Sequence, residues 1–124
     1  MEQNPFSLDK KVILITGASS GIGRECAVTF SKMGATCILV SRSEEKLNLL
    51  REKLPGNTHL VVPFDMTRFE GIEPMIAGCV EITGKINGVV HSAGTEITKP
   101  LKVTSQQDIQ QVMDINAVAA LHLV

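Results

Sequence analysis

The sequence has 124 residues, of which 44% are hydrophobic and 20% are charged, and its formal net charge is −1. This balance is typical of a folded globular domain and argues against a disordered chain. The absence of a basic block argues against a surface for nucleic acid or for an anionic membrane. No apolar run reaches the length of a membrane span, and the first residues lack the regions of a signal peptide. We therefore expect a cytoplasmic protein.

The three cysteines, Cys26, Cys37 and Cys79, are odd in number, widely spaced and surrounded by apolar residues. This pattern favours reduced, buried thiols over a disulfide framework. No spacing of histidine and cysteine is that of a zinc site, so we expect no metal ion.

The first predicted element is a buried parallel strand, because Val12 to Ile15 is a short β-branched apolar run. Gly17, Gly21 and Gly23 follow, and glycine allows the backbone to turn sharply and to approach an anion closely. The first amides of the next helix have no intrahelical partner, and the helix dipole makes that end positive. The order strand, glycines, helix therefore predicts a pyrophosphate-binding turn. The alternative is a glycine-rich surface turn without a ligand.

Further apolar runs alternate with amphipathic stretches along the rest of the chain. We predict strands at about Lys11–Thr16, Thr36–Ser41, His59–Phe64 and Gly88–Ser92, and helices at about Gly21–Met33, Glu44–Lys53 and Phe69–Thr83. Gly34 ends the first helix, and Pro55-Gly56-Asn57 ends the second. This alternation predicts an α/β fold: a doubly wound parallel sheet with helices on both faces, in three layers.

The end of the sequence is predicted to be helical. A last helix begins after Thr104 or Ser105 and runs to the final residue. Its apolar stretch Ala117–Val124 has no cap or polar tail, and domains seldom end on such a segment. We therefore expect residues 1–124 to form the N-terminal part of a single dinucleotide-binding domain.

Four motifs occur in order along the chain. They are Thr16-Gly17-Ala18-Ser19-Ser20-Gly21-Ile22-Gly23, the acid Asp65, the run His91-Ser92-Ala93-Gly94, and Asn116. From about Leu8 to its end, the sequence with these motifs resembles the short-chain dehydrogenases/reductases. The resemblance implies a Rossmann fold, of which this chain would hold about four strands in the order 3-2-1-4. It also implies an oxidoreductase that transfers hydride between a nicotinamide cofactor and a small carbonyl or alcohol substrate, and a homo-oligomer when complete.

The resemblance also assigns residues to the cofactor. Gly17, Ser19, Ile22 and Gly23 would line the pyrophosphate and the adjoining ribose, Asp65 would bind the adenine amino group, and Ala93 and Gly94 would lie near the nicotinamide ribose. The complete predicted cofactor set is Gly17, Ser19, Ser20, Gly21, Ile22, Gly23, Ser41, Arg42, Ser43, Asp65, Met66, Ser92, Ala93 and Gly94. For Asp65 the alternative is a helix cap or turn residue.

The end of the second strand predicts which dinucleotide binds. An NAD site places an acid there for the ribose hydroxyls, whereas a 2′-phosphate needs positive charge and no carboxylate. This chain has Ser41, Arg42 and Ser43 at that point. Arginine presents a charged fork to a phosphate, and the hydroxyls add donors. The sequence therefore favours NADP over NAD, and the alternative is a solvated Arg42.

His91-Ser92 departs from the family, which usually has Asn-Asn-Ala-Gly at this position. A histidine at a strand end is more often packed and hydrogen-bonded than catalytic, so we expect that of His91. The sequence does not predict how this loop is braced.

Asn116 corresponds to the active-site asparagine of the family, which holds a water in a proton relay. An asparagine inside a helix is intrinsically unfavourable, and the alternative here is an exposed helical residue. The family's catalytic Tyr-x-x-x-Lys lies beyond the position of Val124, and this chain contains no tyrosine. We expect the chain alone to be inactive; the alternative function is a non-catalytic NAD(P)-binding module.

Overall fold

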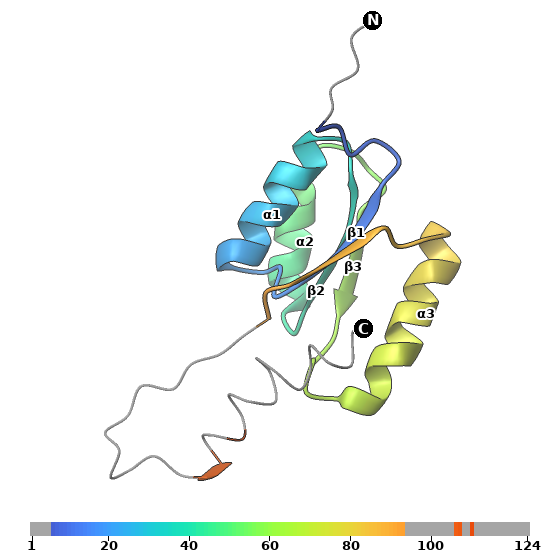
Figure 1. The fold of residues 1–124 in the computed structure, drawn as a ribbon. Coiled ribbons are helices and arrows are strands. Elements are labelled where there is room, and N and C mark those ends of the chain that lie inside the picture. Colours follow the sequence, from blue (N-terminus) through green and yellow to red (C-terminus); the bar gives the residue numbers. More distant parts are fainter. Residues whose placement is uncertain (1–5, 94–105, 108–109, 111–124) are drawn as a thin grey trace, which may run out of the picture.

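A computed structural model describes residues 6–93, 106–107 and 110 (Figure 1). Its elements, in chain order, are β1 (Val12–Thr16), α1 (Gly21–Lys32), β2 (Thr36–Ser41), α2 (Glu44–Lys53), β3 (Leu60–Pro63), the 3₁₀ segment η1 (Phe69–Gly71), α3 (Ile72–Thr83) and β4 (Gly88–His91). Of the predicted last helix, only Gln106, Gln107 and Gln110 are described, and all three are helical. Its apolar end, Ala117–Val124, lies outside the described residues.

The four strands form one parallel sheet in the order β3-β2-β1-β4, which confirms the predicted order. The register aligns the carboxyl ends of the strands. Thr16 of β1 lies opposite Val40 of β2 on one side and His91 of β4 on the other, and Ser41 lies opposite Pro63. The loops that leave these ends therefore emerge along one edge of the sheet.

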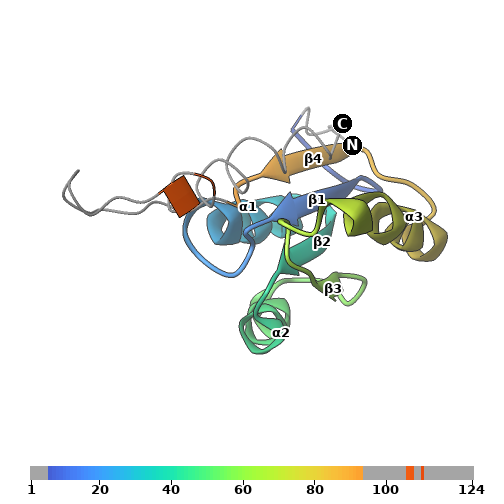
Figure 2. The ribbon, with the colours of Figure 1, turned by 90° about the horizontal axis from the view of Figure 1, so that it is seen from below.

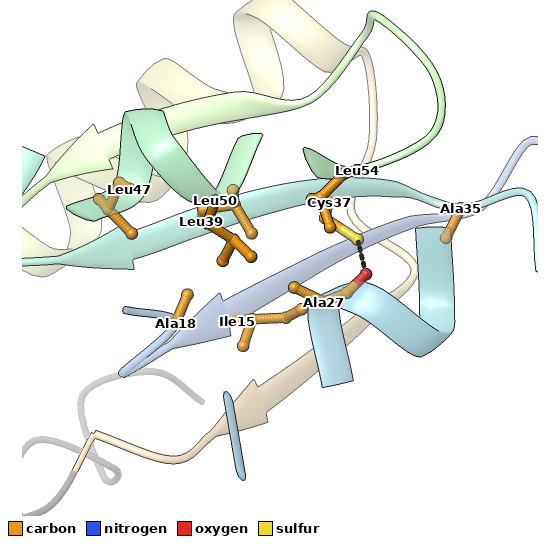
Figure 3. Packing of buried hydrophobic residues seen from close by; sticks show 9 residues of the cluster. All are labelled: Ile15, Ala18, Ala27, Ala35, Cys37, Leu39, Leu47, Leu50 and Leu54. Atoms are coloured by element: carbon orange, nitrogen blue, oxygen red, sulfur yellow. Dashed lines mark hydrogen bonds between the residues drawn. The ribbon is translucent and has the colours of Figure 1, made fainter. Parts of the chain in front are cut away.

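Helices cover both faces of the sheet: α1 and α2 lie on one face and α3 on the other (Figure 2). Successive strand residues point to opposite faces of the sheet and so belong to two different cores. Ile15 packs on the side of α1 and α2, and Leu14 packs on the side of α3. The first core consists of Ile15, Ala18, Ala27, Ala35, Cys37, Leu39, Leu47, Leu50 and Leu54 (Figure 3). The second consists of Val12, Leu14, Ile38, Val40, Met66, Ile72 and Cys79. This is the doubly wound, three-layer arrangement that the sequence predicted.

The third helix differs from its prediction, because it begins at Ile72 rather than at Phe69. The residues before it form a tighter turn, in which the amide of Gly71 donates to the carbonyl of Arg68 at 2.9 Å. Pro74 then falls in the first turn of α3, where its missing N–H removes no helical hydrogen bond. Other predicted element ends differ from the structure by one residue, as is usual at fraying ends.

All three cysteines are free thiols. Cys37 and Cys79 are buried as expected, whereas Cys26 is only partly buried. Burial raises the pKa of Cys37 to about 11 and also raises the pKa of Cys79, so both thiols stay protonated at neutral pH.

Within the described part of the chain, the helices are too short or too polar to cross a bilayer. No three histidine, cysteine or acidic side chains of that part gather as metal ligands.

Candidate nucleotide-binding site

The turn between β1 and α1 has a backbone shape that needs glycine. Gly17 and Gly21 have φ angles of 65° and 57°, which side-chain-bearing residues rarely adopt. The amide of Ala18 donates to the carbonyl of Val40 at 3.2 Å, and this bond ties the turn to the end of β2. A Cβ on Gly23 would overlap the carbonyl oxygen of Gly17 and Oγ of Ser92. The turn is therefore folded against the ends of both neighbouring strands.

The start of α1 is open. Ser20 is the N-cap residue with extended backbone, but its side chain makes no capping hydrogen bond, and the first turn contains no acid. The amides of this first turn thus have no capping side chain among the described residues, while the helix dipole makes them attractive to an anion. This geometry can accept a phosphate group, because unpaired amides and the helix dipole both favour an anion at a helix N-terminus.

Thr16, the last residue of β1, joins the turn to the end of β4. Its Oγ1 lies 2.8 Å from Nδ1 of His91 and accepts from the amide of Ala93 at 3.1 Å. Oγ of Ser92 donates to the carbonyl oxygen of Thr16 at 2.6 Å. His91 is therefore packed and hydrogen-bonded, as the sequence led us to expect. Thr16 itself was missing from the predicted site, although its place at the end of the strand within the glycine motif could have suggested it.

Arg42 follows β2 and is exposed, with a serine on each side. The two serines have structural contacts that the sequence did not predict: Ser41 Oγ accepts from the amide of Ser43, and Ser43 Oγ accepts from the amide of Lys46 at the start of α2. Because each hydroxyl acts here as an acceptor, its hydrogen is still available for donation. No carboxylate stands between Val40 and Glu44.

Asp65 follows β3 and is partly buried. Its Oδ1 accepts from the amide of Thr67 at 2.9 Å and from the Thr67 hydroxyl at 2.7 Å, so the predicted turn role is real. Both bonds go to one carboxylate oxygen. The hydrogen bonds from Thr67 hold the pKa of Asp65 below its usual value against the opposing effect of partial burial, and the charges of Arg42 and Arg68 lower it further. Asp65 is thus an oriented carboxylate at neutral pH. The Asp-x-Thr spacing could have revealed Thr67 as its partner.

The other predicted residues fall into three groups. Ile22 is exposed, Gly23 is buried, and Ser19 and Ala93 are partly buried, all at this edge of the sheet. The side chain of Met66, by contrast, is buried in the core beneath α3, so only its backbone could touch a ligand. Two predicted residues, Gly94 and Asn116, lie outside the part of the chain that the structure describes.

Comparison with known proteins shows the family to which this chain belongs. The family model of the short chain dehydrogenases matches residues 11–124. The chain therefore belongs to the short-chain dehydrogenase family, as its motifs suggested.

Individual relatives agree with this. The chain is 38% identical over 109 residues to the NADPH-dependent pterin aldehyde reductase of Arabidopsis thaliana, covering 86% of this chain and 45% of the relative. It is 32% identical over 114 residues to glucose 1-dehydrogenase of Gluconobacter oxydans, covering 90% and 43%. The solved structure of a short chain dehydrogenase from Salmonella enterica serovar Typhi superposes with a TM-score of 0.87 at 30% identity, covering 99% of this chain and 53% of that one. The chain thus spans about half the length of these relatives.

Proposed function

We propose that the protein to which these residues belong is an oxidoreductase that transfers hydride between NADP(H) and a small carbonyl or alcohol substrate. The observation that carries this proposal is the open start of α1 behind the Gly17–Gly23 turn, at the edge where all four strands end. Ligands of doubly wound sheets bind at this edge. The cofactor, when bound, supplies the hydride chemistry, and this chain supplies binding and orientation.

In this proposal the turn holds the pyrophosphate and the adjoining ribose through Gly17, Ser19, Ser20 and the first residues of α1, which are Gly21, Ile22 and Gly23. Asp65 binds the adenine amino group with the carboxylate oxygen that Thr67 does not use. Ser92, Ala93 and Gly94 lie toward the nicotinamide ribose, and Met66 contributes its backbone.

The proposed preference for NADP rests on Arg42. Its guanidinium is exposed at the end of β2, and the neighbouring hydroxyls of Ser41 and Ser43 each retain a hydrogen to donate. A relative with 38% identity is named as NADPH-dependent, which supports the same choice.

The proposed catalytic residue within this sequence is Asn116. The chain has no tyrosine and covers 43% to 45% of the two relatives described above. We therefore place the remaining catalytic groups outside residues 1–124, which would form the N-terminal part of one Rossmann domain. A cytoplasmic homo-oligomer belongs to the same proposal.

A second candidate is a dinucleotide-binding module that performs no hydride transfer. The observation that favours it is the absence of tyrosine from a chain that contains every predicted cofactor residue. The two candidates differ in turnover and agree in cofactor binding.

The test uses the full-length protein. NADPH and NADH are titrated separately, and oxidation of NADPH is then followed with a panel of aldehydes and ketones. The proposal expects tighter binding of NADPH and turnover with at least one carbonyl compound. Binding without turnover on a broad panel favours the module, and failure to bind either dinucleotide overturns both candidates.

A further inference from the structure

The ends of β1 and β4 are joined by hydrogen bonds that converge on one residue. Thr16 is fully buried, and the three residues that end or follow β4 bond to its side chain and to its backbone carbonyl. His91 Nδ1 and the amide of Ala93 both lie within hydrogen-bond distance of Oγ1, and Ser92 Oγ donates to the carbonyl. Both the side chain and the backbone of Thr16 are therefore held by residues about 75 positions further along the chain.

The direction of these bonds follows from the available hydrogens. The amide of Ala93 can only donate, so Thr16 Oγ1 is its acceptor. A buried hydroxyl also needs an acceptor for its own hydrogen, and among the described residues His91 Nδ1 is the acceptor in reach. Thr16 therefore donates to Nδ1, and the proton of the neutral imidazole is on Nε2.

The same residues also pack against the phosphate-binding turn. A Cβ on Gly17 would lie 2.7 Å from backbone atoms of Ser92 and Ala93, and a Cβ on Gly23 would overlap Ser92 Oγ. Ser92 Oγ therefore occupies the space where the end of β4, the turn and the first turn of α1 meet. Thr16 is the last residue of β1 and directly precedes the turn, so fixing Thr16 fixes the direction in which the turn leaves the sheet.

We propose that His91 and Ser92 are positioning residues of the nucleotide site, which act through Thr16 to hold the Gly17–Gly23 turn in its phosphate-binding conformation. These two residues stand where the sequence departs from the asparagine pair usual in the family. His91 holds the Thr16 hydroxyl, and Ser92 holds the Thr16 carbonyl. The functional part of this inference rests on the proposed function, because it concerns affinity for a dinucleotide.

The chain offers a control in a second hydrogen-bonded histidine, His59, which is buried, whereas His91 is partly buried. His59 lies near the opposite edge of the sheet, where Nδ1 accepts from the amide of Cys37 at 3.0 Å and Nε2 donates to the carbonyl of Pro55 at 2.7 Å. Replacing His59 or His91 removes an imidazole with hydrogen bonds to other parts of the fold. Of these two histidines, only His91 is hydrogen-bonded to Thr16, the residue directly before the turn.

The test compares His91→Ala, His91→Asn, Ser92→Ala and His59→Ala in the full-length protein. Each variant is measured for thermal unfolding, for the Kd of NADPH, and for amide hydrogen exchange across Gly17–Gly23 without ligand. His91→Ala and Ser92→Ala should each raise the Kd roughly tenfold, the scale of one hydrogen bond, and speed exchange in the turn. His91→Asn should restore both values, because its carbonyl oxygen can accept from Thr16. His59→Ala should lower the melting temperature and leave the Kd of the folded protein unchanged.

The outcomes separate this inference from the proposed function. If the wild-type protein binds NADPH and both alanine variants at the end of β4 bind it equally well, the positioning role is overturned and the proposed function stands. A rise in Kd that is the same for His59→Ala as for His91→Ala also overturns it. If the wild type binds no dinucleotide, the proposed function is overturned, and with it any role for these residues in affinity. Should His91→Ala fail to fold, Ser92→Ala tests the same positioning role, because it removes the hydrogen bond to the Thr16 carbonyl.

Discussion

Two helices, α1 and α2, begin at the carboxyl edge of the sheet, and they begin in different ways (Figure 1). Ser43 caps α2 by accepting from the amide of Lys46 at 3.3 Å, and Glu44 and Glu45 place negative charge in its first turn. Ser20 stands at the same position before α1, yet its side chain makes no capping bond and no acid follows. The side chain of the N-cap serine thus accepts a hydrogen bond at the start of α2 and does not at the start of α1. In our proposal the start of α1 receives the phosphates of the cofactor instead.

This difference shows why a helix start alone does not identify a phosphate site. Every α-helix has unpaired amides and a positive N-terminal dipole, and side chains usually satisfy them. Gly17 before α1, and Gly21 and Gly23 in its first turn, allow close approach of the backbone, and the start of α2 has no glycine. In our proposal the start of α2 contributes instead the cation that precedes its cap, Arg42.

The largest effect is expected where the start of α1 is most tightly packed. In Gly23→Ala the new methyl group meets the Gly17 carbonyl and Ser92 Oγ, so the backbone must shift, and we expect a loss of about 3 kcal/mol in unfolding free energy. Gly78→Ala in α3 is the matched control, because its Cβ would meet no atom within 4 Å and alanine favours a helix by about 1 kcal/mol. Chemical denaturation of both variants gives the measurement. Equal stability of the two would contradict the packing described for the turn.

The next effect concerns the cation before α2. Arg42→Ala should weaken NADPH binding by about 1.5–3 kcal/mol, the range for a hydrogen bond to a charged group, and change NADH binding little. Parallel titrations with the two cofactors measure the difference. Equal losses of affinity for both cofactors would contradict a contact between Arg42 and the 2′-phosphate and favour the alternative of a solvated Arg42.

The two N-cap serines give a direct test of the comparison. Ser43→Ala removes a capping bond and should cost about 1 kcal/mol of stability. Ser20→Ala removes no such bond and should change the unfolding free energy by less than about 0.5 kcal/mol. Urea unfolding of both variants measures these two changes in unfolding free energy. A similar cost at both positions would mean that α1 is capped like α2.

The smallest effect is expected at Asp65. Its pKa is lower in the folded protein than its usual value, so its charged form stabilises the fold above the usual carboxyl range. That contribution is lost as the pH falls through the folded pKa. In Asp65→Asn the side-chain oxygen can still accept from Thr67, but the titrating carboxylate is gone. Between pH 7 and pH 2 the melting temperature of this variant should therefore fall less steeply with pH than that of the wild type. At pH 7 it should weaken dinucleotide binding; unchanged binding would leave Asp65 with the turn role alone.

Much of the fold could be predicted from the sequence, because apolar runs and turn residues mark elements locally. The order of the strands came from the family resemblance, and the structure confirms it. The site could be predicted only where one short motif carries it, as with the Gly17–Gly23 turn. The hydrogen bonds of His91 and Ser92 to Thr16 could not be predicted. They depend on the register between strands that are distant in the sequence and on which nitrogen of His91 carries the proton. The start of α3 was misplaced because a 3₁₀ turn and an α-helix have similar sequence patterns over three residues.

The central claim is that the start of α1 binds the phosphates and the start of α2 does not. Backbone amide shifts of the full-length protein, recorded by NMR during titration with NADPH, test it most directly. We predict that the amides of Ser19 to Gly23 shift most and follow the binding curve, while those of Glu45 and Lys46 change little. Saturable binding with the larger shifts at Glu45 and Lys46, or with no shift at Ser19 to Gly23, would contradict the account.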